Sequence, residues 1–234
     1  MKQDRCNKKG SKGVFGICPK TCYGYMRNIE SVLNRKLNIL VPDSMDGYTA
    51  ITFLRYGHNV DCYEKDNFLL YGGINDSFHT IGFNQKILNE RLQSLVNINE
   101  DNYYETKVEK QYDFVYSYRS LHLERNKHLS LKKKVKKLLS SVKTNGYLYI
   151  FYYMADNNSD YTNYPENQYF IPCEMKSYFD LNDWEIIYSI ENHKRNHKAH
   201  PFNKVDHFHK VGTIFARKKN NRRKLIYRYI YTIK

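Results

Sequence analysis

The segment from residue 38 to residue 64 constrains the fold more than any other part of the chain. Residues 37–41 are a largely apolar run with β-branched members, of the kind that forms a strand buried on both faces. A turn follows, then a short helix over residues 49–56 and a second strand that ends in an acid, Glu64. This order predicts a βαβ unit at the start of an α/β domain, and Glu64 stands where nucleotide-binding domains hold ribose hydroxyls.

Segments with strand and helix periodicity continue to alternate along the rest of the chain, which predicts a parallel sheet flanked by helices. The long connection before the last strand favours an antiparallel final pair. We predict helices over residues 25–36, 83–95, 123–142 and 173–179, and further strands over residues 59–64, 102–105, 112–117, 146–153, 184–190 and 211–217.

Length and composition predict one globular domain with appendages. With 234 residues, 41% of them hydrophobic and 15% aromatic, the chain can bury a single sizeable core. Its apolar runs are too short to span a bilayer, and no apolar stretch follows the charged residues at its amino terminus, as it would in a signal peptide. We therefore expect a cytoplasmic protein without membrane contact.

The net charge of +14 is concentrated at the two ends of the chain. Residues 1–36 hold nine Lys and Arg against two acids, residues 217–234 hold eight and no acid, and residues 37–216 are nearly neutral. We interpret residues 1–24 as a basic arm, 25–218 as the folded domain and 219–234 as a basic tail. Such arms favour contact with polyanions such as nucleic acid, and solvated ends without a partner are the alternative.

The five cysteines predict reduced thiols, because an odd number in a chain without a secretory signal argues against disulfides. Cys18 and Cys22, with Cys6 upstream, offer three thiolates to a metal. Zinc sites usually show clearer cysteine pairs and a fourth ligand, and none is adjacent here. We therefore predict ordinary cysteines and no metal site.

Three groups of residues together resemble one protein family. They are residues 39–42 with 57–60 and Glu64; residues 112–117 with 144–148; and residues 183–187 with 210–218. In this combination the chain resembles class I methyltransferases that depend on S-adenosylmethionine (SAM), and most closely their tellurite-resistance and thiopurine-type branch. The resemblance implies an α/β, Rossmann-like fold: a seven-stranded, mostly parallel sheet with an antiparallel last strand and helices on both faces.

The resemblance also implies a SAM site across the carboxyl ends of the first, second and fourth strands. By position, the turn Asp43, Ser44, Met45, Asp46 and Gly47 wraps the methionine end, Glu64 and Lys65 meet the ribose, Asp101 or Asn102 meets the adenine edge, and Ser117 lies beside the sulfonium. The family has two or three glycines in this turn, because the cofactor needs the space that a side chain takes. Here Met45 stands where glycine is usual. A turn that still binds SAM and a fold that has lost SAM are the two alternatives.

Candidates for catalysis or substrate contact lie near the ends of two later strands. Tyr118 and Arg119 follow the strand over residues 112–117, at the edge where ligands bind in such sheets. Before the last strand, imidazoles that can steer an anion or act as a general base come from His193, His197, His200, His207 and His209, of which His207 and His209 are the catalytic candidates. A metal bound by His193 and His197 on one helical face, and a solvated loop, are the alternatives.

The sequence contains no obvious acid–base dyad, and methyl transfer to a thiol or metalloid oxyanion needs little acid–base help. The resemblance therefore implies a SAM-dependent methyltransferase with a small-molecule acceptor, most simply a thiol or an oxyanion such as tellurite, working as a monomer or homodimer. One alternative is a nucleic-acid methyltransferase that holds RNA on the basic ends and on the lysines of residues 132–137. The other is a binding protein that no longer uses SAM.

Overall fold

The computed structural model describes residues 12–13, 16–17, 20–75, 78–155, 169–197 and 207–220. Most of the predicted basic arm and tail, together with Cys6, Cys18 and His200, lie outside these residues. In the described part of the chain, no helix is both long enough and apolar enough to cross a membrane.

Strands and helices alternate along the described chain. The strands are β1 (Lys12–Gly13), β2 (Gly16–Ile17), β3 (Asn38–Val41), β4 (Asn59–Tyr63), β5 (Gly73–Asn75), β6 (Phe78–Thr80), β7 (Val96–Asn99), β8 (Tyr112–Tyr118), β9 (Val142–Met154), β10 (Trp184–His197) and β11 (His207–Lys218). The helices are α2 (Lys20–Leu33), α3 (Ala50–Leu54), α4 (Asn67–Tyr71), α5 (Phe83–Glu90), α6 (Leu131–Ser140) and α7 (Glu174–Ser177). Three short 3-10 helices are η1 (Gln93–Leu95), η2 (Ser120–His122) and η3 (Glu124–Asn126).

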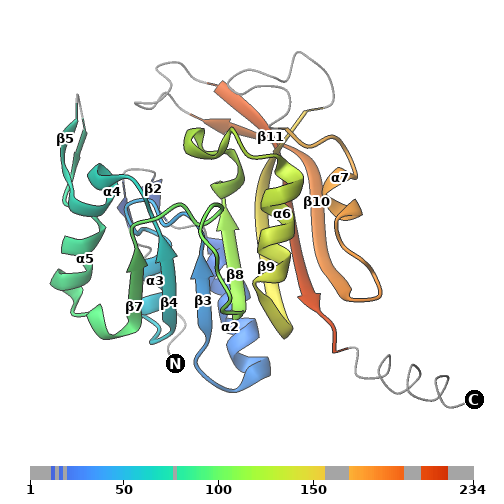
Figure 1. Cartoon of the computed structure of the whole chain (residues 1–234), viewed down its shortest axis with the longest axis horizontal. Helices are drawn as coiled ribbons and strands as arrows, with labels where there is room; N and C mark the ends of the chain where they lie inside the picture. The colour runs from blue at the N-terminus through green and yellow to red at the C-terminus, as the bar shows by residue number, and fades with distance from the viewer. Residues whose placement is uncertain are drawn as a thin grey trace, which may run out of the picture.

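Seven strands form one sheet in the order β10-β11-β9-β8-β3-β4-β7 (Figure 1). Neighbouring strands from β9 to β7 run parallel, whereas β11 runs antiparallel to both β9 and β10. The predicted Rossmann-like sheet with its antiparallel last strand is therefore confirmed. Because β8, β3, β4 and β7 are parallel neighbours, their carboxyl ends meet at one edge.

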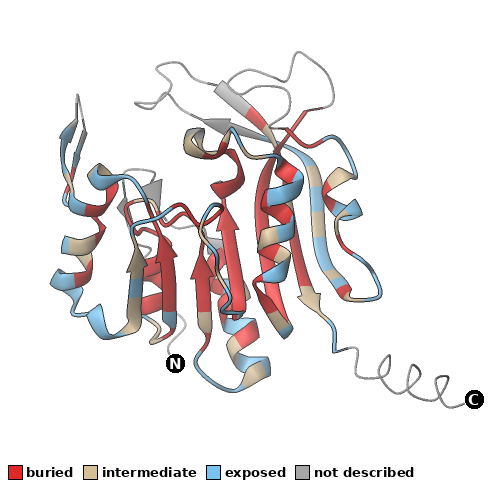
Figure 2. Ribbon diagram, in the orientation of Figure 1, coloured by how far each residue is buried: buried red, intermediate tan, exposed pale blue. Residues whose placement is uncertain are grey.

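The core consists of two apolar layers, one on each face of the sheet, and the central strands β3, β4 and β8 are buried over most or all of their length (Figure 2). Helices α2, α3, α4 and α5 contribute to one layer, and α6 and α7 to the other. On β3, Ile39 and Val41 belong to the first layer and Leu40 to the second. This alternation explains why the predicted strand is a continuous apolar run: both of its faces are covered.

The strand predicted over residues 102–105 is wrong, because the third parallel strand is β7, which ends at Asn99. Asn102 instead begins a turn. Its side-chain oxygen accepts a hydrogen bond from the Tyr104 N–H at 3.0 Å, and its carbonyl accepts from the N–H of Glu105 and of Thr106, both at 3.0 Å. An asparagine side chain thus offers the backbone an alternative to the strand ladder.

Four helices are shorter than predicted: α3 and α7 lose only residues at their ends, whereas the helices predicted over residues 83–95 and 123–142 lose more. The helix predicted over residues 123–142 begins at Leu131, because Ser130 is its N-cap and accepts a hydrogen bond from the Lys133 N–H at 3.3 Å. The helix predicted over residues 83–95 ends at Glu90, where Arg91 takes a left-handed backbone conformation with φ of 55°. The segment between Ser117 and Ser130 is therefore formed by short 3-10 turns.

An ion pair ties together the amino ends of the central strands. Arg35 donates two hydrogen bonds to the Asp113 carboxylate, at 2.7 and 2.8 Å, and the Asn38 N–H donates a third at 2.9 Å. Lys143 Nζ lies 3.4 Å from the same carboxylate. Burial alone would raise the pKa of Asp113, but these donors hold it below its ordinary value. Asp113 is therefore a charged anchor between β3, β8 and β9.

A buried histidine makes the stability of the fold depend on pH. His58 is fully buried, and its Nδ1 accepts a hydrogen bond from the Leu37 N–H at 3.1 Å, so the ring packs in its neutral form. Burial lowers the pKa of His58 to about 4, from an ordinary value of 6.5. Between these pH values the unfolded chain binds a proton that the folded chain does not bind. The stability that neutral His58 gives is complete above the unfolded pKa and is lost as the pH falls toward 4.

We expect His58→Gln to flatten this dependence, because the glutamine oxygen can accept the same N–H and does not titrate. Between pH 7 and pH 4, the difference in unfolding free energy between wild type and variant should change by about 3 kcal/mol. Urea denaturation at each pH measures this difference, in which the titration of shared carboxylates cancels. A difference that stays constant over the range would show that His58 does not titrate in this way.

Candidate active site

The residues predicted to bind SAM lie along the edge where the parallel strands end. Asp43 to Gly47 follow β3, Glu64 and Lys65 follow β4, Asp101 and Asn102 follow β7, Ser117 lies near the end of β8, Tyr118 ends that strand, and Arg119 follows it. Lys65 and Asp101 are exposed, whereas Asp43, Glu64 and Ser117 are buried. The roles of these residues toward SAM remain predictions.

An arginine lies between two of these acids. Arg125 of η3 donates to both oxygens of Glu64, from Nη1 at 2.5 Å and from Nη2 at 2.8 Å. The same guanidinium donates to Asp43 Oδ1, from Nε at 3.0 Å and from Nη2 at 2.8 Å. We call this arrangement the Arg125 bridge, and it joins the turn after β3 to the end of β4. Exposed fractions of the side chains are 2% for Asp43, 0% for Glu64 and 20% for Arg125.

The Arg125 bridge places one cation against two buried carboxylates. Burial raises the pKa of Asp43 to about 7; Arg125 opposes this shift and the neighbouring Glu64 adds to it. Burial also raises the pKa of Glu64 above its ordinary value, against the effect of Arg125. The two carboxylates outweigh burial at Arg125 and raise the pKa of the guanidinium. The site therefore holds two carboxylates against one guanidinium, and desolvation favours the protonated, neutral form of these acids.

Backbone donors complete the surroundings of Glu64. The Met45 N–H donates to Oε2 at 2.8 Å, and the Asp66 N–H donates to Oε1 at 2.9 Å. Met45 has a φ of 56°, in the left-handed region that favours glycine. The turn thus adopts at Met45 a conformation suited to the glycine that is usual there, while carrying a side chain.

Helix α5 packs against the same turn. Gly47 has a φ of 83°, and a Cβ placed on it would lie 2.0 Å from Phe83 Cδ2. Lys86, one turn further along α5, donates to the Asp46 carbonyl at 2.9 Å and to the Asp46 carboxylate at 2.8 Å. The close contact at Gly47 therefore serves helix packing, and the Lys86 ion pair holds the helix in place.

A chain of buried hydroxyl groups continues from the end of β8. Ser117 Oγ lies 2.6 Å from Ser120 Oγ, which lies 2.6 Å from Tyr104 OH. The Asn126 side-chain amide donates to the Ser120 carbonyl at 2.9 Å and to Asp43 Oδ2 at 3.3 Å. The predicted sulfonium neighbour Ser117 is thus connected through hydrogen bonds to Asp43 and the Arg125 bridge.

Lys134 of α6 fixes the backbone that carries Arg125. It is fully buried, and its ammonium donates to the carbonyls of Leu121 and Asn126, the second at 3.2 Å. Burial lowers the pKa of Lys134 to about 8, although nearby Asp43 opposes the shift. An ammonium bound to two carbonyls gives η2 and η3 a rigid support despite their lack of regular helix.

Aromatic rings surround the predicted acceptor side. His209 of β11 is buried and stacks on Tyr153, with ring centroids 4.4 Å apart. His122 lies beside the same tyrosine, and its Nε2 accepts a hydrogen bond from the Tyr153 N–H at 2.9 Å. Tyr118 is buried beside Phe151, with centroids 4.8 Å apart. Of these rings, Tyr118 and His209 were candidates from the sequence.

The remaining candidates for substrate contact are an arginine after β8 and histidines on the last two strands. Arg119 lies over the Tyr118 ring, 5.3 Å from its centroid. His207 begins β11 and pairs with His197 in the strand register, and its side chain lies outside the described residues. The interpretation of His193 and His197 as neighbours on a helix is wrong, because both lie on β10. Residues four apart on a strand are roughly 13 Å apart, too far for a metal held through helical spacing.

Arg125, Asn126, His122 and Lys86 were not identified from the sequence. Arg125 and Asn126 fell inside the predicted helix over residues 123–142, where they look like ordinary surface positions. One signal was available: a buried acid requires a counter-charge, and the turn and Glu64 together bring two acids to one edge. That argument predicts a cation near them without indicating which one.

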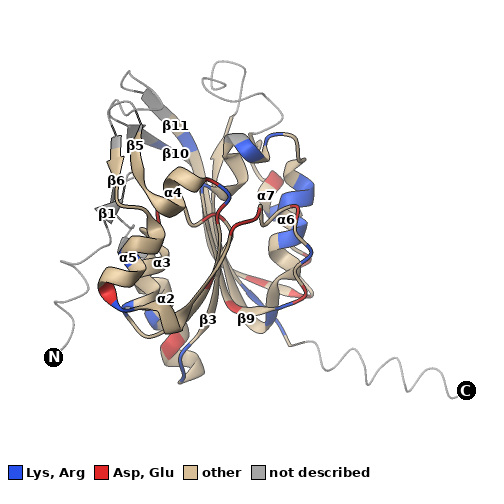
Figure 3. Cartoon of the chain, turned by 60° about the vertical axis from the view of Figure 1, so that its left-hand side comes forward, with Lys and Arg blue, Asp and Glu red and all other residues tan. Residues whose placement is uncertain are grey.

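Not all lysines of residues 132–137, which were suggested to contact nucleic acid, are exposed. Lys134 is buried, and Lys137 is half-buried and donates to the Thr106 carbonyl. Helix α6 therefore exposes Lys132, Lys133 and Lys136. Figure 3 shows the concentration of basic residues along this helix.

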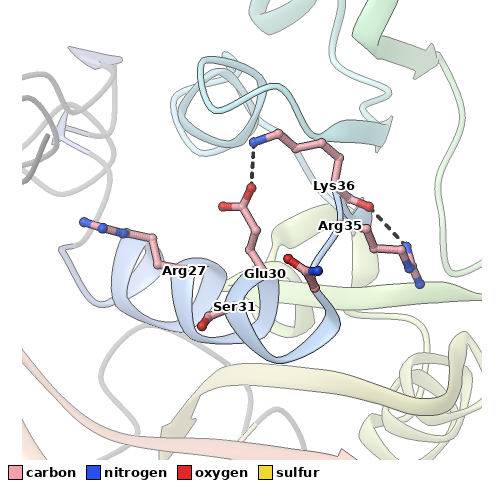
Figure 4. Close-up of a pocket in the computed structure, with 6 residues that line it drawn as sticks. Arg27, Glu30, Ser31, Arg35 and Lys36 are labelled. Atoms are coloured by element: carbon pink, nitrogen blue, oxygen red, sulfur yellow. Dashed lines mark hydrogen bonds and ion pairs between the residues drawn. The ribbon is translucent and has the colours of Figure 1, made fainter.

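A separate hollow of about 480 Å³ lies beside the end of α2, toward the amino ends of the strands (Figure 4). Lys36 and Glu30 in its wall pair with each other at 2.6 Å, and Arg35 pairs with Asp113. Most of its charge is thus neutralised within the protein, and it lies away from the predicted SAM residues.

Solved structures of methyltransferases share this fold. TehB from Haemophilus influenzae matches 84% of the chain with a TM-score of 0.63 and 18% identity, and the chain spans only 62% of TehB. The 1,6-didemethyltoxoflavin-N1-methyltransferase of Burkholderia thailandensis, with bound S-adenosylhomocysteine (SAH), matches 85% of the chain and 78% of its own length with a TM-score of 0.51 and 14% identity. The CcbJ methyltransferase of Streptomyces caelestis matches 94% and 97% with a TM-score of 0.58 and 10% identity.

No protein-family model and no curated protein matches the chain. The strand order, the antiparallel last strand and these structural matches give it the fold of class I SAM-dependent methyltransferases.

Proposed function

We propose that the chain is a SAM-dependent methyltransferase that acts on a small molecule, with a thiol or a metalloid oxyanion as acceptor. Glu64 carries the proposal. It follows β4 directly, is fully buried, and is oriented by the N–H groups of Met45 and Asp66. A carboxylate in this place suits a ribose diol, and the Burkholderia methyltransferase of the same fold binds SAH.

The residue types along the carboxyl edge fit the parts of SAM. The turn ending at Gly47 would hold the methionine end, Glu64 the ribose, Asn102 the adenine edge, and Ser117 the region of the sulfonium. When bound, SAM supplies a methyl group on a positively charged sulfur. Two buried carboxylates, Asp43 and Glu64, face the single guanidinium of Arg125 at this edge, an arrangement that suits a ligand with positive charge.

The chain's own contribution to methyl transfer would be alignment and exclusion of water. Tyr118, Tyr153 and His209 form a buried aromatic wall beside β8 and β9. His122, the other imidazole of this wall, uses its Nε2 to accept a backbone hydrogen bond. A wall of this kind can orient an acceptor, and a soft nucleophile that is already anionic needs no base.

Calorimetric titration with SAH tests the cofactor, and transfer of labelled methyl from SAM tests the acceptor. We expect SAH to bind and label to pass to a small thiol or to tellurite. Label that passes to RNA instead would favour the nucleic-acid alternative. A chain that binds neither SAM nor SAH at millimolar concentration is not a SAM-dependent enzyme.

A second candidate function is a binding protein that no longer uses SAM. The observation that favours it is the Arg125 bridge, since a guanidinium contacts both oxygens of Glu64. Met45 at a glycine position points the same way. The same titration separates the two functions.

A further inference from the structure

Arg125 and ribose hydroxyls need the same acceptors on Glu64. An ionised carboxylate offers about four acceptor positions, two on each oxygen. On Glu64, Oε1 accepts from Arg125 and from the Asp66 N–H, and Oε2 accepts from Arg125 and from the Met45 N–H. The protein's own donors therefore fill all four positions, and a diol can bind Glu64 only in exchange for one of them.

Of these donors, the guanidinium is the one that can leave. The N–H groups of Met45 and Asp66 belong to the backbone that shapes the site. The Arg125 side chain is 20% exposed, and a long, flexible stem carries its guanidinium. Lys134 holds the backbone of η3 through the Asn126 carbonyl at 3.2 Å. The guanidinium can therefore move out while the chain that carries it stays in place.

We propose that Arg125 is an internal competitor of the cofactor: it pairs with Glu64 and Asp43 in the free protein, and SAM binds only when its guanidinium leaves. This inference rests on the proposed function, because the ribose of SAM is the incoming ligand. Each binding event must break the Arg125 bridge, so the apparent affinity equals the affinity of the open form multiplied by the fraction of molecules that are open. Arg125 thereby sets the SAM concentration at which the protein fills.

Calorimetric titration of wild type and Arg125→Gln with SAH tests this proposal. Glutamine cannot pair ionically with the two carboxylates, so we expect SAH to bind the variant about tenfold more tightly or better. Tightening is informative because general damage to the fold would weaken binding. Arg55→Gln is the matched control: Arg55 donates two hydrogen bonds to Glu90, both at 2.6 Å, on the outside of α3, and its loss should leave the affinity unchanged.

Arg125→Lys provides a second measurement, since it keeps a cation beside the two buried acids but cannot contact both oxygens of Glu64 as the guanidinium fork does. It should fold even if Arg125→Gln does not, and should also bind SAH more tightly than wild type. Wild type that binds SAH as tightly as these variants, or more tightly, overturns the competition and leaves the proposed function intact. Absence of SAH binding in all of them overturns the proposed function, and the competition with it.

Discussion

Replacing Glu64 by alanine is expected to abolish SAH binding and to destabilise the protein by about 3–5 kcal/mol, the usual cost of removing one partner of a buried ion pair. The change leaves the Arg125 guanidinium with Asp43 alone. It also leaves the N–H groups of Met45 and Asp66 without their acceptor. Urea denaturation measures the loss of stability, and calorimetry measures the loss of binding.

Glu90→Ala is the control for this experiment. Glu90 pairs with Arg55 at 2.6 Å, but both side chains are about one-third exposed. Exposed pairs contribute about 1 kcal/mol or less, so the control should remain close to wild type in stability and should bind SAH normally. Equal losses from Glu64→Ala and Glu90→Ala would contradict the buried, central position of Glu64.

Gly47→Ala should produce a second large effect, a loss of about 2–5 kcal/mol in the free energy of unfolding. About 1–2 kcal/mol comes from placing a side chain at a left-handed φ of 83°, and about 1–3 kcal/mol from overpacking against Phe83. Chemical denaturation measures the sum. Repeating the substitution in a Phe83→Leu background should recover part of the loss, because the smaller side chain leaves room for the new methyl group.

Gly24→Ala provides the opposite control. Gly24 lies within α2, and a Cβ there would meet no atom within 4 Å, so alanine should stabilise the helix by about 0.5–1 kcal/mol. If Gly47→Ala lowered the free energy of unfolding no more than Gly24→Ala does, the result would contradict the close packing of α5 against the turn.

The parts of the fold that the sequence predicted well are those that are buried on both faces. Strand β8 reads as a strand because it is rich in aromatic and β-branched residues, and every one of its residues is buried. Strand β7 escaped prediction because it is only four residues long, lies at the edge of the sheet, and half of its residues are Asn, which is depleted in strands. The strands β5 and β6 are only three residues long each, so their pattern carries little information.

The candidate site divides in the same way. The positions of Asp43 and Glu64 follow from strand ends, which a pattern of residues can locate. In the Arg125 bridge, Arg125 contacts Glu64, which is 61 positions away in the sequence, and Asp43, which is 82 positions away. No local pattern encodes which arginine makes these contacts. Burial then decides the chemistry, because the raised pKa values of both acids follow from desolvation that only the folded chain produces.

Asp113 has a consequence for the alignment of the central strands. Strands β3 and β8 pair at Ile39 with Phe114 and at Leu40 with Val115. Side chains alternate along a strand, so sliding β8 by a single residue would turn each of its side chains toward the wrong layer of helices.

The same slide would carry Ser117 about 3.3 Å along the sheet relative to Asp43. The Asp113 carboxylate resists it, because its hydrogen bonds with Arg35 and the Asn38 N–H fit one alignment of the two strands. The Asp113 carboxylate at the amino ends of these strands thus fixes the distance between Ser117 and Asp43, the candidate ligand contacts at the carboxyl ends.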